Sequence, residues 1–270
     1  MLVNRLNNTL PCQPLVSGGA APPPPAFSPS DIDGLRLWLN SDAANVNAGS
    51  PTNLDDVATW IDKSTATNNA TQVTAINQPV WNSSGGSNGT SFIDFNGTTD
   101  YLLNGDFASD VLSAGNQVFT FLSVFKLNSL PAANQIILGL SAAGTNYNRF
   151  ELRQSSSGEL KILIRESLAD GGSFVQTDVD VTADTGWHYI LWTFNNDVLN
   201  CYLDGSQVIT NVTQGLGNVA PLSFTLGALQ TGSPAFFADC SISEVISYNN
   251  VISAGEIADL DSYINGIYSL

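Results

Sequence analysis

His188 is the single histidine of the chain, so any acid–base chemistry by an imidazole must centre on it. A serine–histidine–aspartate triad also needs a nucleophile beside the ring and a carboxylate behind it. His188 opens the predicted strand Trp187-His188-Tyr189, and we expect no nucleophile elbow of the Gly-x-Ser-x-Gly type to present a catalytic serine. The sequence therefore favours a structural or surface histidine.

Glycoside hydrolysis needs two carboxyl groups that flank one bond, and retaining enzymes hold them about 5 Å apart. The closest spacing of acids here is Asp178-Val179-Asp180, which is typical of the polar face of a strand. No strand of the pattern Glu-x-Asp-x-x-Glu occurs in the chain. The sequence therefore disfavours hydrolysis.

Calcium is the one cofactor that the sequence leaves open, because it binds carboxylate and carbonyl oxygens from loops. The candidate ligands are Asp94, Asp100, Asp204 and Asp239. No EF-hand loop orders these residues, and aspartate is also common in ordinary turns. Three cysteines and one histidine, with no Cys-x-x-Cys pair, do not suggest a zinc site.

Half of the basic residues fall on one predicted hairpin, although the chain has only eight Lys and Arg residues in all. These four residues are Arg149, Arg153, Lys161 and Arg165. The period of two in a strand places them on one face, opposite the apolar residues of the same strands. We expect either a solvated outer face or a strip that docks on an acidic partner.

The overall composition restricts the partners. Acidic residues outnumber basic ones 24 to 8, for a net charge of −16. Phosphates and anionic lipids are repelled by such a surface, so we expect no nucleic-acid and no membrane partner. Residues 1–11 lack the apolar segment of a secretory signal, which favours synthesis in a reducing cytoplasm.

The elements that position these residues are mostly strands, because short runs alternate between apolar and polar residues from Asp31 onward. The predicted strands cover residues 35–39, 118–127, 149–153, 160–166, 189–194, 199–203, 206–209, 223–226 and 242–248. Asp204-Gly205 predicts a type I′ turn, since both positions tolerate a positive φ. Without βαβ alternation or a long repeat, we expect an all-β sandwich of two sheets over residues 31–270.

One helix is predicted near the C-terminus. Ser253 and Glu256 form a capping box, and Ile257, Leu260 and Ile264 make one apolar stripe after it. We expect this helix to pack on the sandwich.

The alternation of the strands also predicts core positions. We expect Trp187, Tyr189, Leu203 and Ile242 to be buried. Cys201 and Cys240 fall on apolar faces, so we expect both to point inward as free thiols.

Residues 1–30 differ from the rest in composition, with one charged residue before Asp31 and the run Pro22 to Pro25. Polyproline is extended and has no internal hydrogen bonds, so we expect an N-terminal arm. The apolar residues that could anchor this arm to a partner are Leu2, Val3, Leu6, Leu10, Leu15 and Val16.

Five stretches resemble, in order, the laminin-G-like, concanavalin A-like lectin/glucanase superfamily. They are residues 93–102, 119–121, 186–189, 202–206 and 242–248. The resemblance implies a jelly-roll sandwich with a concave face that often binds glycans. Residues 27–39, 60–64 and 257–268 are also similar to such domains in structural proteins of tailed bacteriophages, and no catalytic signature of the family's enzymes is present.

The narrower resemblance implies a non-enzymatic virion protein, a capsid decoration or head-fibre protein whose arm binds a capsid or other virion protein. We then expect many copies or a homo-oligomer on the virion surface, after synthesis in the host cytoplasm. The alternative is a carbohydrate-binding tail component that recognises a cell-surface glycan, which an exposed aromatic platform such as Trp81 or Tyr147 would favour. A glycoside hydrolase is the third hypothesis.

Overall fold

The computed structural model describes residues 27–105, 107, 118–141, 149–165, 175–213, 223–230 and 232–270. For residues 149, 165 and 175–181 it describes the backbone alone. The arm residues Leu2, Val3, Leu6, Leu10, Leu15 and Val16 therefore lie outside the described residues, as does Tyr147.

The first sheet has the strand order β14-β13-β12-β7-β18-β5-β4, and β1 also pairs with β18. Its strands are β1 (Leu35–Asn40), β4 (Val80–Asn82), β5 (Phe92–Asn96), β7 (Val118–Leu127), β12 (Trp187–Asn195), β13 (Val198–Leu203), β14 (Ser206–Thr213) and β18 (Asp239–Tyr248). The long strand β18 pairs with β7 along one edge. Its other edge is shared, because β5 pairs with its first half and β1 with its second half.

The second sheet has the order β11-β10-β9-β8-β15-β6-β3-β2. Its strands are β2 (Thr59–Trp60), β3 (Ala70–Thr71), β6 (Leu102–Asn104), β8 (Gln135–Ser141), β9 (Arg149–Gln154), β10 (Glu159–Arg165), β11 (Val175–Thr182) and β15 (Ser223–Leu226). A separate ribbon pairs β16 (Leu229–Gln230) with β17 (Pro234–Ala235). Four 3-10 turns lie at η1 (Pro29–Asp31), η2 (Ala43–Asn45), η3 (Ala75–Asn77) and η4 (Ser87–Gly89).

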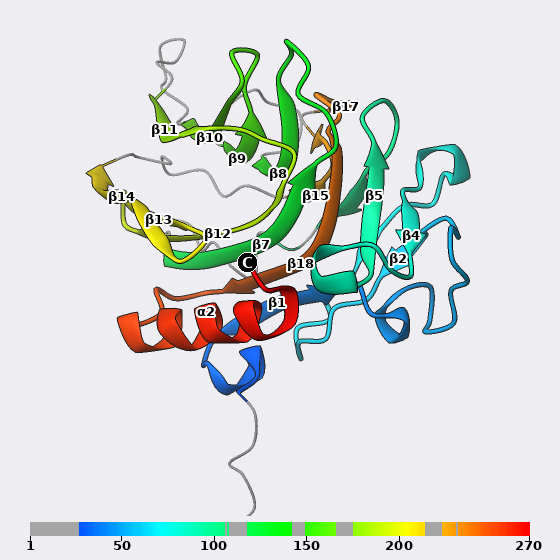
Figure 1. The fold of residues 1–270 in the computed structure, drawn as a ribbon, viewed down its shortest axis with the longest axis horizontal. Coiled ribbons are helices and arrows are strands. Elements are labelled where there is room, and N and C mark those ends of the chain that lie inside the picture. The colour runs from blue at the N-terminus through cyan, green and yellow to red at the C-terminus, as the bar shows by residue number, and fades with distance from the viewer. Residues whose placement is uncertain are drawn as a thin grey trace, which may run out of the picture.

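Helix α2 (Ala254–Tyr268) covers the face of the first sheet that points away from the second sheet (Figure 1). One apolar core fills the space between the two sheets, and a second, smaller core lies between the first sheet and α2. Trp192 illustrates the main core, because its ring stacks between Phe121 at 5.5 Å and Phe150 at 5.3 Å. The predicted all-β sandwich of two sheets with one C-terminal helix is thus confirmed.

The helix begins as its sequence predicts. The Ser253 Oγ accepts a hydrogen bond from the Glu256 backbone N–H at 3.3 Å, and the Glu256 carboxylate accepts one from the Ser253 N–H at 2.6 Å. Leu260 and Ile264 are buried against the first sheet, together with Tyr268 one turn further on. No helix among the described residues is long and apolar enough to cross a membrane.

The predicted core positions are only partly confirmed. Tyr189 and Ile242 are buried, whereas Trp187 and Leu203 are partly buried. Trp187 is the first residue of β12, and its ring packs on the side of Phe92 at 5.7 Å, at the end of the sheet rather than inside it. Cys201 and Cys240 are buried free thiols, as predicted.

Residues 27–30, which the composition assigns to the arm, pack against the domain. The Tyr248 hydroxyl donates a hydrogen bond to the Pro29 carbonyl at 3.0 Å. The ring of Phe27 contacts that of Tyr263 on α2, with centroids 6.2 Å apart. The packed part of the chain therefore includes residues 27–30.

The strand pairing brings several connections to one end of the sandwich. Asp239 pairs with Asn96, Gln135 with Gln154, and Trp187 with Lys126, so the chain turns next to each of these pairs. We call this the turn end. It comprises residues 96–101, 128–134, 155–158, 183–186, 204–205 and 232–238.

Candidate functional site

Phe236, at the turn end, is the one exposed aromatic residue in the described part of the chain, with 47% of its surface accessible to solvent. Its backbone has φ +57°, a left-handed conformation that costs a non-glycine residue about 1 kcal/mol. The Phe236 carbonyl accepts a hydrogen bond from the Ile136 N–H at 2.9 Å, which ties the segment to β8. The ring is thus held in solvent by a fixed and strained backbone.

Two contacts join the segment after Phe236 to the β5–β6 turn. The ring of Phe237 lies against that of Tyr101, with centroids 6.4 Å apart. Gly97 has φ +70°, and a Cβ atom there would lie 2.8 Å from the Asp239 Cβ atom. The close approach of these two segments therefore requires glycine at position 97.

The β5–β6 turn is held by the side chain of Asn96. Its Oδ1 atom accepts hydrogen bonds from the N–H groups of Thr98 at 2.8 Å and Thr99 at 2.9 Å. Its Nδ2 atom donates to the Asp100 carboxylate at 2.7 Å. Asp100 is buried, and desolvation raises the pKa of its carboxyl group.

Further polar side chains at the turn end are fixed by one another. Ser129 Oγ donates to the Asp239 carboxylate at 2.6 Å, and Gln135 Oε1 accepts from the Asp239 N–H at 2.6 Å. On β5, the Asp94 carboxylate accepts hydrogen bonds from Asn128 and Ser241, both at 2.8 Å. These groups are therefore in place before any ligand arrives.

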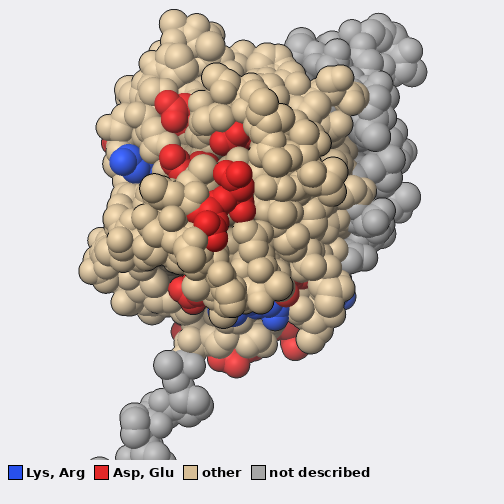
Figure 2. Space-filling model, turned by 90° about the vertical axis from the view of Figure 1, so that its right-hand side faces the viewer, with Lys and Arg blue, Asp and Glu red and all other residues tan. Residues whose placement is uncertain are grey.

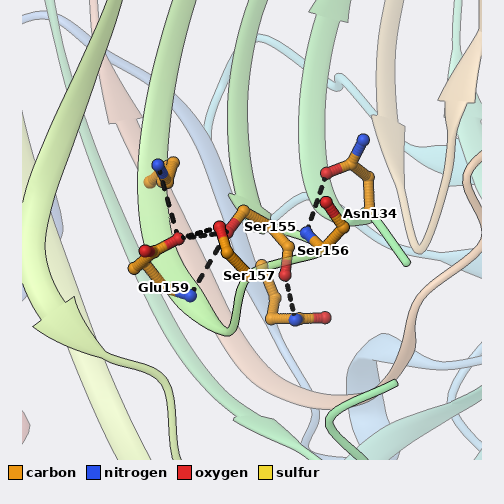
Figure 3. A network of polar contacts seen from close by, with 7 residues as sticks. Asn134, Ser155, Ser156, Ser157 and Glu159 are labelled. Atoms are coloured by element: carbon orange, nitrogen blue, oxygen red, sulfur yellow. Dashed lines mark hydrogen bonds and ion pairs between the residues drawn. The ribbon is translucent and has the colours of Figure 1, made fainter. Parts of the chain in front are cut away.

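The β9–β10 turn forms a compact polar network (Figure 3). The Glu159 carboxylate accepts a hydrogen bond from Ser155 Oγ at 2.6 Å and one from Ser157 Oγ, and the Lys161 Nζ atom lies 3.4 Å away. The serine hydroxyls, with a smaller contribution from Lys161, lower the pKa of Glu159 to about 2. The Ser156 N–H donates to Asn134 at 3.1 Å, which joins this turn to the β7–β8 loop.

His188 lies between two carboxylates. Its Nδ1 atom is 2.7 Å from Asp204 and its Nε2 atom is 2.9 Å from Asp184. The hydrogen bond to Asp204, followed by the one to Asp184, raises the pKa of His188 to about 9, against the opposing effect of burial. Both ring nitrogens are occupied and protonated at neutral pH, so this imidazole cannot activate a nucleophile.

A pocket opens beside this imidazole. It is lined by His188, Asp184, Thr182, Ala183 and the apolar residues Phe125, Leu127, Leu160 and Leu203. Its walls are mostly apolar, and its two charged side chains, His188 and Asp184, are paired with each other.

The chain does contain a Gly-x-Ser-x-Gly motif, so the expectation that it has none is wrong. The motif is Gly85-Gly86-Ser87-Asn88-Gly89. Ser87 lies in η4, and its Oγ donates to the Tyr268 carbonyl at 2.6 Å, so the hydroxyl bonds to the end of α2. The chemistry of a triad is absent at this serine as well.

The proposed calcium ligands do not form one group. Asp204 lies in the β13–β14 turn and bonds to His188, whereas Asp94, Asp100 and Asp239 lie on or next to β5 and β18. The strands β12 and β7 separate these two regions in the first sheet. The described residues contain no group of three or more His, Cys, Asp or Glu side chains that could hold a metal ion.

The aromatic platform predicted at Trp81 is wrong. Trp81 is 5% exposed, and its indole N–H donates to the Ser41 carbonyl at 2.7 Å. The exposed aromatic residue is instead Phe236, which sequence analysis missed. The sequence Pro-Ala-Phe-Phe-Ala at 234–238 does not distinguish the exposed ring from the packed ring of Phe237.

For two of its four residues, Arg153 and Lys161, the basic strip is not a freely solvated surface. The side chain of Lys161 is 10% exposed and lies near Glu159, and that of Arg153 is 13% exposed and lies 3.8 Å from Glu151. Acidic residues of the same hairpin therefore neutralise these cations. The side chains of Arg149, Arg165, Asp178 and Asp180 lie outside the described part.

Comparison with known proteins places this geometry in a family. Residues 96–258 match the family described as the concanavalin A-like lectin/glucanases superfamily. The comparison with curated protein sequences gave no match.

Similar folds occur among solved structures. Domain 4 of AbnA, a GH43 extracellular arabinanase from Geobacillus stearothermophilus in complex with arabinotriose, aligns with a TM-score of 0.56 and 13% identity, over 84% of this chain and 98% of that domain. A sialidase from Trypanosoma rangeli, in complex with the inhibitor DANA, aligns with a TM-score of 0.51 and 14% identity. That alignment covers 83% of this chain but 32% of the sialidase, so the chain spans about a third of its length.

These comparisons overturn the hypothesis of a phage virion protein. The similar structures are a sialidase and an arabinanase domain, and the matched family is one of lectins and glucanases. The capsid decoration, head-fibre and tail roles rested on a resemblance in short stretches that these findings do not support. The match spans more than half of the sequence, and the chain belongs to the concanavalin A-like lectin/glucanases superfamily.

Proposed function

We propose that this chain is a non-catalytic carbohydrate-binding domain and that its glycan lies on the ring of Phe236. The observation that supports this proposal most is the exposure of Phe236 next to fixed polar groups. Aromatic rings have a negative face, on which the weakly positive C–H groups of a sugar ring can pack.

The polar groups around Phe236 suit sugar hydroxyls. A binding site needs a few convergent donors and acceptors that fix the orientation of the ligand. Asp239, three residues beyond Phe236, is held by Ser129 and Gln135. Because these side chains are already ordered, a sugar would bind without the entropic cost of arranging them.

Backbone strain alone does not identify the site. Leu54 is also exposed, at 62%, and also has a left-handed backbone with φ +70°. It is aliphatic, and it lies before β4 rather than at the turn end. The aromatic ring and its polar surroundings distinguish Phe236, and Leu54 provides a matched control.

The ionisation of Glu159 and His188 argues against either residue as the general acid or base of a glycosidase. A glycosidase needs a carboxyl group that is still protonated near neutral pH and can act as the general acid. The pKa of Glu159 is lowered to about 2, so this exposed carboxylate cannot donate a proton. The pKa of His188 is raised to about 9, which makes it a poor acid and removes it as a base.

The similar structures support a glycan ligand but not its identity. The arabinanase domain that aligns over nearly its whole length was solved with arabinotriose. The alignment with the sialidase covers only part of that protein. Arabinotriose is therefore a rational first probe, within a broad set of oligosaccharides.

The test is a glycan array, followed by calorimetry with arabinotriose and with each glycan that the array selects. We expect wild-type protein to bind, Phe236→Gly to bind at least about tenfold more weakly, and Leu54→Gly to bind as wild type does. Absence of binding to every glycan, or full binding by Phe236→Gly, would refute the proposal. Release of smaller sugars from a bound oligosaccharide would refute the non-catalytic part.

A further inference from the structure

We infer that the glycan bound at Phe236 is uncharged and that glycans with a carboxylate, such as sialylated ones, are rejected by the acidic side chains around this ring. This inference rests on the proposed function and names the class of ligand.

The contacts described above connect the segments that carry the acidic side chains to the segment that carries Phe236. Asp239 follows Phe236 by three residues and touches Gly97 of the β5–β6 turn. Asp100 ends that turn, and the negative charges of Asp94 and Asp56 act on it. Phe237 and Tyr101 hold the same two segments together, so these carboxylates and the Phe236 segment belong to one region.

The surface view agrees with this assignment. Figure 2 shows the side of the molecule that carries β4 and β5, where Asp and Glu side chains form a stripe with few Lys or Arg side chains nearby. Asp94 lies on β5, and Asp56 forms a bridge with Val80 of β4. A ligand that approaches this side meets a negative potential.

Two positive charges of the second sheet have acidic neighbours on their own hairpin. The cations closest to β8 in strand order are Arg153 on β9 and Lys161 on β10. They lie within salt-bridge distance of Glu151 and Glu159, respectively. Lys126 on β7 pairs with Ser241, whose hydroxyl binds the Asp94 carboxylate, so this cation lies on the same face as Asp94. Near β8, the carboxylate of a ligand would therefore find only cations that already have acidic neighbours.

An uncharged sugar is attracted by the same carboxylates. Its hydroxyl groups can donate hydrogen bonds to carboxylate oxygens, and such bonds are stronger than those to neutral acceptors. The net charge of −16 also repels anionic glycans at long range. This long-range part is screened by salt, whose Debye length falls from about 20 Å at low salt to a few Å at high salt.

The experiment uses an array of matched pairs, in which each oligosaccharide is printed with and without a terminal sialic or uronic acid. At about 20 mM salt we expect the uncharged member of each bound pair to bind at least about tenfold more tightly. We expect this gap to shrink at about 500 mM salt. Equal or tighter binding of the acidic members would overturn the inference and leave the proposed function standing. Absence of binding to any member would refute the proposed function itself.

Two charge-removing variants sharpen the test. Asp239→Asn removes a carboxylate beside the platform. At low salt, we expect it to reduce the ratio of the affinities for the uncharged and the acidic oligosaccharide of a pair by about threefold. Asp197→Asn removes the same charge from the β12–β13 turn, at the opposite end of the sandwich, and should leave the gap unchanged. An equal effect of both variants would show that net charge, rather than the carboxylates around Phe236, sets the preference, and would overturn the site-specific inference.

Discussion

The Tyr268 hydroxyl donates a 2.9 Å hydrogen bond to Oε2 of Glu244, a carboxylate that is completely buried between the first sheet and α2. The other oxygen of Glu244 accepts from the Trp38 indole N–H at 2.6 Å and from the Tyr263 hydroxyl at 2.8 Å. One side chain thereby joins β1, β18 and α2. Burial raises the pKa of Glu244, against the lowering effect of its three donors.

Glu244→Gln and Glu244→Ala should therefore differ strongly. The amide of Gln keeps one oxygen for Trp38 and Tyr263, and Tyr268 can rotate to accept from its NH₂ group. The alanine variant leaves buried donors without acceptors and should lose about 3 kcal/mol of unfolding free energy. Urea unfolding of both variants measures this difference, and equal losses would contradict the proposed role of the carboxylate.

The pH dependence of Glu244 gives a second measurement. A carboxyl group with a raised folded-state pKa binds more protons in the native state, so its contribution to stability falls as pH rises above its ordinary value near 4.3. Glu244→Gln cannot lose a proton. The unfolding free energy of this variant relative to wild type should therefore increase from about pH 5 to about pH 8, and a constant difference would contradict the shift.

The raised pKa of His188 predicts that the protein loses stability at alkaline pH. Its pKa is raised to about 9, so its contribution is complete below the unfolded value near 6.5 and disappears as pH rises through 9. After allowance for solvent screening of the partly exposed pair, we expect protonated His188 to contribute about 2 kcal/mol to the free energy of unfolding. Because the chain has one histidine, an NMR titration of its ring protons needs no assignment.

The two carboxylate partners should act unequally on this titration. Asp204→Asn removes the larger cause of the shift and should lower the pKa of His188 more than Asp184→Asn does. The Asp204 carboxylate also accepts the Tyr189 N–H at 2.9 Å, so Asn keeps an acceptor there. A wild-type pKa near 6.5 would show that neither contact exists in solution.

Gly227 and Gly158 allow the free-energy cost of adding a side chain to be compared at two similar backbone conformations. Both have a positive φ, of +75° and +87°. A Cβ atom at Gly227 would lie 2.2 Å from a ring atom of Phe95, whereas at Gly158 no atom lies within 4 Å. Alanine at Gly158 should cost about 1 kcal/mol, and alanine at Gly227 should cost more than about 4 kcal/mol or prevent folding. Thermal unfolding compares them, and similar melting temperatures would contradict the core contact.

The sequence predicts those parts of this fold that depend on neighbours in the chain. The alternation of β12, the φ-tolerant pair Asp204-Gly205 and the capping box at Ser253 are local, and all three are confirmed. Which face of β12 meets the other sheet and which meets α2 depends on distant residues. Tyr189 is therefore buried as predicted, but against the helix rather than in the main core.

The candidate site could not be predicted for the same reason. Trp81 is buried because its indole N–H finds the Ser41 carbonyl, 40 residues away in the chain. Phe236 is exposed because Ile136 fixes its backbone from another strand. Neither contact leaves a local signal in the sequence. The aromatic residue with the larger ring is therefore buried, and Phe236 is the exposed one.

Variants of Phe236 can separate the role of its ring in binding from its role in stability. A residue with φ +57° is strained unless it is glycine, so Phe236→Gly should be about 1 kcal/mol more stable than Phe236→Ala, despite the greater entropy of glycine in the unfolded chain. Both variants lack the ring and should bind glycan equally weakly. If the ring were kept for packing, both variants would instead lose about 3 kcal/mol or more of unfolding free energy relative to wild type. Urea unfolding alongside calorimetry decides between these cases, because a ring kept for a ligand can be removed with a large loss of binding and a small loss of stability.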